Sequence, residues 1–208
     1  MSVPVDKLGL PYDNRLLSEI PQSETYLTSN KVVNVVRSIP ELRQQPTMRA
    51  IHRQTIHGES GRYNVHQRQV INKDGGGVYV PPINTKDYLG YGLYQISGED
   101  NKKDYVGYLE RTSQPFTVKS QILFNLAVIN GTDSVLGVGS TRRDAFQSDY
   151  NRYKDSDPMK ALISYNVNIL RNENANMVNP NSRRNSTFQR FLKEELEYQK
   201  IIDGESNE

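Results

Sequence analysis

Histidine, serine and glutamate side chains gather between residues 52 and 66, and such side chains can serve as metal ligands or as a nucleophile with its base. The run Gly58-Glu59-Ser60 begins a G-x-S-x-G motif, which exposes a reactive serine on a turn between a strand and a helix. Arg62 stands where that motif needs its second glycine, and no buried strand precedes the run. The sequence therefore predicts no catalytic serine in this segment.

The three histidines, His52, His57 and His66, could in principle join Glu59 around a metal ion. Their spacings of five and nine residues do not bring the rings onto one face of a helix. The chain has no cysteine, which excludes thiolate metal sites, disulfides and a cysteine nucleophile. The motifs of common nucleotide-binding and zinc enzymes, G-x-x-x-x-G-K-[ST], G-x-G-x-x-G and H-E-x-x-H, are also absent. Solvent-exposed or interface histidines are therefore expected, without a metal ion or a cofactor.

Acidic side chains offer one other route to catalysis. Asp155 and Asp157 lie close in sequence to Asp144 and Asp149, and pairs of carboxylates can act as acid and base. Acids near the N-terminus of a helix also stabilise its partial positive charge, which requires no further role. An enzyme with an unrecognised carboxylate site is therefore the third hypothesis for this chain.

Residues 37–73 carry seven lysine or arginine residues against two glutamates, a local charge of +5. The cationic and aromatic side chains of this segment include Arg49, Arg53, Arg62, Tyr63, His66 and Arg68. Guanidinium groups bind phosphates while rings stack on bases, but guanidinium groups also pair with carboxylates and stack on tyrosine in protein grooves. The segment thus predicts a contact surface, and the mild net charge of +2 for the whole chain favours protein over nucleic acid as the partner.

Residues 193–208 carry six acidic residues against two lysines, a local charge of −4. Opposite charges at two places in one chain suit contacts with oppositely charged surfaces. In a repeating assembly, the acidic end of one copy could meet the basic segment of the next.

The length of 208 residues suits one domain of ordinary size with extended arms. Hydrophobic residues make up 35% of the chain, below the globular average, so part of its order is expected to depend on partners. No apolar run approaches the roughly 20 residues that span a bilayer, and residues 1–14 lack the apolar core of a secretory signal. The chain is expected in the cytoplasm or in a virus particle, without membrane insertion.

The strongest secondary-structure pattern is the alternation of residues 116–129. One face of an extended strand would carry Phe116, Val118, Ile122, Phe124, Leu126 and Val128. Asn130-Gly131 follows, a pair typical of the tight turn of a β-hairpin, and residues 135–138 would form the return strand. This hairpin is the predicted spine of the fold.

A second hairpin is predicted from residues 88–97 and 104–111, with a polar connection that contains glycine. Several tyrosines fall in these two strands. Tyr91 and Tyr94 are expected on a face that docks other proteins, since tyrosine is favoured in interfaces.

A short edge strand is predicted at residues 78–80, because three glycines precede it and two prolines follow it. Residues 49–73, by contrast, are expected to form a loop with one or two irregular strands. With the two hairpins, these patterns predict an α+β fold whose core is a small antiparallel β-sheet or sandwich over residues 78–139.

Residues 1–28 are predicted to form an extended arm, because three prolines interrupt short apolar groups and exclude a long helix. A frayed terminus is the alternative for this segment. A short helix is expected to follow, with Ser29 or Asn30 as its N-cap and Pro40 beyond its end.

Helices are predicted after the sheet. Thr141 and Asp144 form a capping box before an apolar stripe, and Pro158 suits the first position of a second helix. Residues 158–170 fit either a helix or a strand, and the clean alternation of apolar and polar side chains favours a strand over residues 163–169.

A linker is predicted over residues 171–185, which are rich in asparagine, and an amphipathic helix over residues 186–204. Ser186 and Gln189 make the capping box of that helix, and Gly204 closes it. The apolar face of the helix includes Phe188, Phe191 and Leu192.

These features together predict a non-enzymatic structural subunit of a large protein assembly: a connector, linker or ring component, with a phage virion neck or tail as the specific setting. A single core domain over residues 29–170 would carry the arm, the linker and the terminal helix, and such segments suit ordering on a neighbour. A nucleic-acid-binding accessory protein that uses residues 49–73 is the alternative. The predicted partners are other subunits, including copies of this chain. The predicted contact residues are Arg49, Arg53, Arg62, Tyr63, Arg68, Tyr91, Tyr94, Phe188, Phe191 and Leu192.

Overall fold

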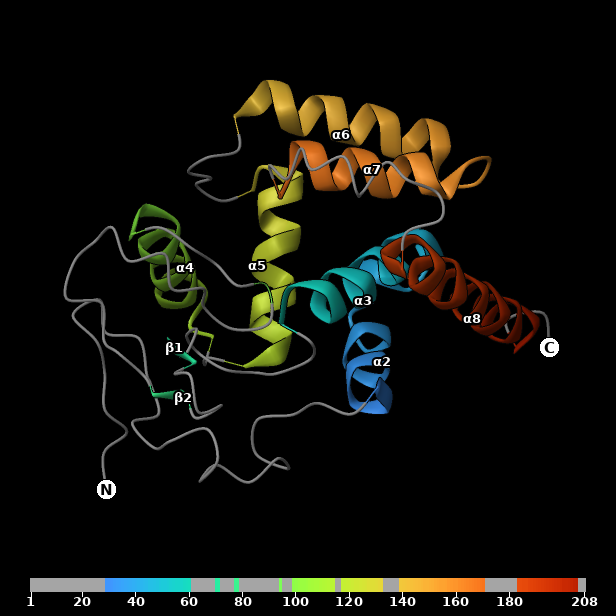
Figure 1. Cartoon of the computed structure of the whole chain (residues 1–208), viewed down its shortest axis with the longest axis horizontal. Helices are drawn as coiled ribbons and strands as arrows, with labels where there is room; N and C mark the ends of the chain where they lie inside the picture. The colour runs from blue at the N-terminus through green and yellow to red at the C-terminus, as the bar shows by residue number, and fades with distance from the viewer. Residues whose placement is uncertain are drawn as a thin grey trace.

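The computed structural model describes residues 29–60, 70–71, 77–78, 94, 99–114, 117–132, 139–170 and 183–205. This part of the chain is predominantly α-helical (Figure 1). Its helices are α2 (Ser29–Arg37), α3 (Pro46–Ser60), α4 (Glu99–Thr112), α5 (Val118–Asn130), α6 (Ser140–Tyr153), α7 (Pro158–Asn168) and α8 (Arg183–Glu205), with a 3₁₀-helix, η2 (Pro40–Leu42), between α2 and α3. The arm predicted over residues 1–28 and most of the predicted linker lie outside the described residues.

Helix α5 stands at the centre of the fold, with α4 beside it and the pair α6 and α7 across one end (Figure 1). Helix α3 packs against α2 and α8, and it also meets α7. One apolar core joins these elements, because buried side chains from almost every helix belong to a single cluster. Its fully buried members include Ile39, Ile51, Ile122, Phe146, Tyr165 and Phe188.

The segment predicted as the spine of a β-hairpin is the helix α5. All but one of the residues from 120 to 129 are buried, on every face of the helix. A helix that is buried on every face does not need the apolar stripe that marks an amphipathic helix. Its apolar residues can therefore also alternate as they would on one face of a strand, and the sequence pattern does not separate the two structures. The strand predicted over residues 116–129 is wrong for this reason.

Both ends of α5 carry the local signals of a helix. The Ser120 amide donates to Thr117 Oγ1 at 3.1 Å, and the Thr117 amide donates to Ser120 Oγ at 2.9 Å, which forms a capping box. Gly131 ends the helix at a φ of 66°, in the left-handed region that glycine adopts without strain. The glycine therefore closes a helix where the sequence predicted a hairpin turn. The predicted return strand, residues 135–138, lies outside the described residues.

The return strand of the second predicted hairpin, residues 104–111, lies inside helix α4. Tyr105 and Tyr108 stand three residues apart, so both rings face α5 and pack against Phe124 at centroid distances of 5.0 and 5.4 Å. An alternating pattern over so few residues cannot exclude this helical spacing, and the prediction is wrong. Of the partner strand predicted over residues 88–97, the structure describes Tyr94 alone.

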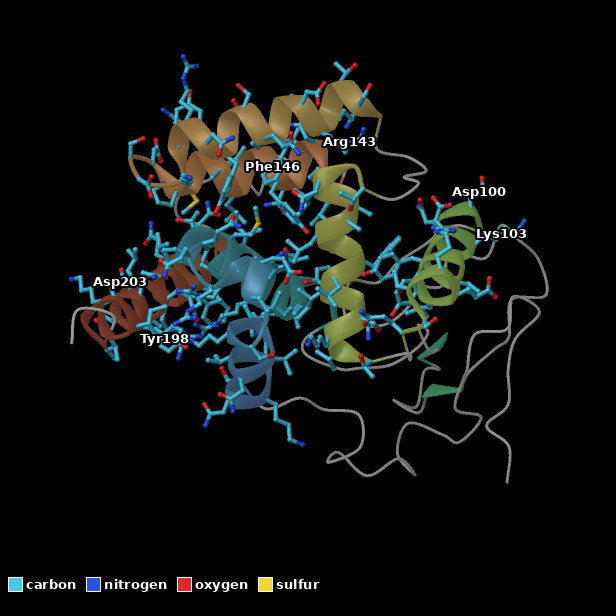
Figure 2. All side chains as sticks on the ribbon, turned by 180° about the vertical axis from the view of Figure 1, so that it is seen from behind. Asp100, Lys103, Arg143, Phe146, Tyr198 and Asp203 are labelled. Carbon is cyan, nitrogen blue, oxygen red and sulfur yellow. The ribbon has the colours of Figure 1, made fainter. Side chains whose placement is uncertain are left out.

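The strand predicted over residues 163–169 is also wrong, because these residues belong to α7. Pro158 lies in the first turn of this helix, as the sequence predicts. The Tyr165 ring meets Phe146 of α6 at a centroid distance of 5.6 Å. Figure 2 shows Phe146 where α6 and α7 run together. The choice between helix and strand is therefore made by the packing of α7 on α6.

Three predicted helices are confirmed, with different ends. Helix α2 begins at the expected serine and stops before the proline. The N-cap of α6 is Gly139, which has no side chain, and Thr141 lies inside the helix, so the predicted capping box of Thr141 and Asp144 is wrong. Helix α8 begins at Arg183, ahead of the predicted cap Ser186, and continues through Gly204.

Helix α3 occupies a segment for which the sequence predicted a loop and irregular strands. Pro46 holds the first helical position, where its missing N–H is not needed. Every residue from 47 to 56 is buried, although polar side chains make up more than half of them. Polar composition therefore misleads here, because α3 lies inside the fold.

The β-structure of the described residues consists of one short antiparallel pair. Strands β1 (Val70–Ile71) and β2 (Gly77–Val78) lie with Val70 opposite Val78. These residues fall where an irregular strand and an edge strand were predicted. A two-residue pair is no sheet core, so the predicted α+β sheet or sandwich over residues 78–139 is replaced by packed helices.

Candidate functional site

Helix α3 carries buried polar side chains on several faces. They are Thr47, Arg49, His52, Arg53, Gln54 and Thr55. A buried polar group without a hydrogen-bond partner costs free energy, so each of these groups needs a partner. Helix α8, which lies against α3 in Figure 1, supplies most of the partners of the two arginines. The contact between α3 and α8 is therefore a polar one at its centre.

Glu195 of α8 is the hub of this contact, and its side chain is fully buried. Its Oε2 accepts hydrogen bonds from Arg49 Nε at 2.7 Å and from Arg37 Nε at 3.1 Å. Its Oε1 accepts one from Arg53 Nη1 at 2.6 Å. Three arginines thus converge on one carboxylate, and Glu194 also pairs with Arg53. We call these five residues, Arg37, Arg49, Arg53, Glu194 and Glu195, the Arg–Glu cluster.

Arg49 is also fully buried, and its guanidinium makes five hydrogen bonds. Nε binds the Glu195 carboxylate, and Nη1 donates to the carbonyl oxygens of Leu42 and Arg43 at 2.7 and 2.6 Å. Nη2 donates to the Glu195 carbonyl oxygen at 3.2 Å and to Gln199 Oε1 at 3.0 Å. Because a guanidinium has five N–H donors, the hydrogen-bonding capacity of Arg49 is filled within the chain.

The guanidinium groups of all three arginines lie over aromatic rings of α8, and those of Arg37 and Arg53 lie nearest. Arg37 lies over Tyr198 at 3.9 Å from the ring centroid, and Arg53 lies over Phe191 at 4.3 Å. Figure 2 shows Tyr198 where α8 meets α2. Each ring adds a cation–π attraction of about 1 kcal/mol to the ion pairs.

The charges of the Arg–Glu cluster nearly balance. Three guanidinium groups and two carboxylates leave one excess positive charge. Burial alone raises the pKa of Glu195, but hydrogen bonds from Arg37 and Arg49 and the charge of Arg53 outweigh it, so the pKa lies below its usual value of 4.5. Glu195 is therefore ionised at neutral pH, as the three arginines require.

A second buried polar site surrounds His52 of α3. His52 Nδ1 lies 2.6 Å from the Tyr94 hydroxyl, and its ring meets the Tyr165 ring edge-on at a centroid distance of 6.4 Å. Tyr165 donates from its hydroxyl to Asn125 Oδ1 at 2.7 Å, which ties this site to α5. Among the described residues, His52 Nε2 has no hydrogen-bond partner. Burial lowers the pKa of His52 to about 3, so this histidine is neutral.

The structure brings together part of the contact set predicted from the sequence. Arg49 and Arg53 meet the terminal helix of their own chain, and Tyr94 binds His52. Phe188 and Phe191 are buried, and Leu192 is partly buried beside the core. The remaining members of that set, Arg62, Tyr63, Arg68 and Tyr91, lie outside the described residues.

Sequence reasoning missed four residues that complete these two sites: Arg37, Glu194, Glu195 and Gln199. His52 was considered only as a metal ligand and was expected to be solvent-exposed or in an interface, whereas it is fully buried. The sequence does contain a signal for Glu194 and Glu195, because the basic segment and the acidic terminus have opposite charges and could therefore attract each other. That complementarity was expected between copies, and the structure shows it within one chain. Helical spacing also distinguishes Glu195, which stands four residues after Phe191 and three after Leu192 on the apolar face, from Glu197, which lies off that face.

Two of the four acids considered for catalysis, Asp149 and Asp157, make ordinary structural contacts. Asp149 accepts a hydrogen bond from Ser164 Oγ at 2.8 Å, and Asp157 pairs with Lys160 at 3.2 Å. Within the described ranges, no three histidine or acidic side chains are placed to hold a metal ion. The same ranges contain no helix with both the length and the apolar character needed to cross a membrane. No protein-family model matches the chain, and no curated protein matches it.

Proposed function

We propose that this protein is a non-enzymatic interaction subunit of a larger protein assembly, acting as a connector, linker or ring component that contacts copies of itself. The observation that carries this proposal is the orientation of α8. This helix turns Glu195 into the core and leaves Leu196 and Ile201 exposed to 43% and 59%. Among the described residues, Leu196 and Ile201 are the large apolar side chains that are exposed to solvent.

An apolar side chain gains free energy when a partner covers it, at about 25 cal/mol per Å². A contact on the outer side of α8 would bury Leu196 and Ile201 and leave the Arg–Glu cluster intact beneath it. Leu196 and Ile201 stand five residues apart, and the exposed charged side chains of Lys193, Glu197 and Lys200 lie between them around the helix. Interfaces that are not permanent commonly mix apolar and charged side chains in this way.

The arginines of the basic segment support protein over nucleic acid as the partner. The hydrogen bonds of Arg49 are filled within the chain, and Arg53 is buried against Glu194 and Glu195. Two of the four arginines that could bind phosphates are thus already occupied. The cytoplasm or a virus particle, with a phage neck or tail as the specific case, is the setting we propose.

Light scattering after size-exclusion chromatography tests the proposal over a range of protein concentrations. We expect a mass above one chain, and we expect Leu196→Gln and Ile201→Gln each to weaken self-association about tenfold, since each removes a buried apolar contact. Lys193→Gln is the matched control, because it changes an exposed α8 side chain without removing apolar area. A single-chain mass at every concentration would contradict the proposal.

Binding of short oligonucleotides at several salt concentrations tests the alternative on the same samples. Affinity that falls steeply with salt would favour a nucleic-acid-binding function. We expect no such binding.

A further inference from the structure

We draw no further inference here: the strongest candidate, the buried side-chain cluster in which His52 of α3 contacts Tyr94 and Tyr165, belongs to the second polar site already described, and nothing among the described residues shows what its Nε2 would bind.

Discussion

Arg49 and Glu195 lie 146 residues apart in the sequence and form a fully buried ion pair, with Nε and Oε2 2.7 Å apart. The pair joins the segment of highest positive charge to the acidic end of the chain. The sequence predicted a basic contact surface in this segment, but the guanidinium of Arg49 lies in an internal contact. The stability of the fold should therefore depend on single charges at this place.

Replacement of Glu195 by glutamine tests this dependence. Glu195→Gln keeps the shape of the side chain and removes the charge that three buried or partly buried arginines share. We expect the free energy of unfolding to fall by roughly 3 kcal/mol, because removing one partner of a buried pair leaves uncompensated charge. Urea denaturation measures this loss. Glu197→Gln, on the exposed side of the same helix, should change the free energy by less than about 0.5 kcal/mol. Equal effects of the two substitutions would show that Glu195 is not held as described.

Buried His52 should make the fold sensitive to mild acid. Burial lowers its pKa from 6.5 to about 3, so the unfolded chain binds a proton below pH 6.5 that the folded chain does not bind. Stability is therefore complete above pH 6.5 and decreases as the pH falls. Between pH 7 and pH 5 we expect a loss of about 2 kcal/mol from this group, at 1.36 kcal/mol per pH unit below 6.5.

The variant His52→Phe removes this titration and keeps a ring beside Tyr165. Its free energy of unfolding is expected to be lower at pH 7, because the bond to the Tyr94 hydroxyl is lost, but to change less between pH 7 and pH 5. This range lies above the titration of Glu195, whose pKa is below 4.5. A pH dependence identical to that of the natural chain would contradict the role of His52.

Two glycines with different environments provide a matched test of the helix ends. Gly131 has a positive φ, and an added Cβ would lie 2.8 Å from Arg143 Nε; Figure 2 shows Arg143 beside this end of α5. Gly131→Ala should lower the free energy of unfolding by about 1 kcal/mol, since alanine is strained in that conformation. Gly204 lies in α8 with open space around it, so Gly204→Ala should be neutral or stabilising by up to about 1 kcal/mol. Thermal unfolding followed by circular dichroism compares the two, and a larger loss for Gly204→Ala would refute the assignment.

Local signals in the sequence located several elements correctly. Ser29 and Pro40 bracket α2, and Pro158 starts α7. The apolar spacing of Phe188 and Phe191 identified the terminal helix. These signals act within a few residues, so a single sequence contains all that is needed to read them.

Local signals in the sequence did not identify the core helices α3 and α5. Residues of α5 are buried on all sides and mostly apolar, and many residues of α3 are polar and yet buried. The pattern of α5 lacks the amphipathic stripe that marks a helix at a surface, and in α3 polar side chains are buried beside the apolar ones. The surroundings of each helix, and not its own periodicity, decide its conformation.

The sequence by itself determined the end of α2 before Pro40, the start of α7 at Pro158, the absence of cysteine chemistry and the opposite charges of the basic segment and the acidic terminus. The tertiary structure alone decided that these charges meet within one chain, and that α4 and α5 are helices and not strands. The physical reason is the distance along the chain over which each interaction acts. A cap or a proline acts on the backbone next to it, whereas a buried charge is stable only beside a partner that the fold brings from more than a hundred residues away.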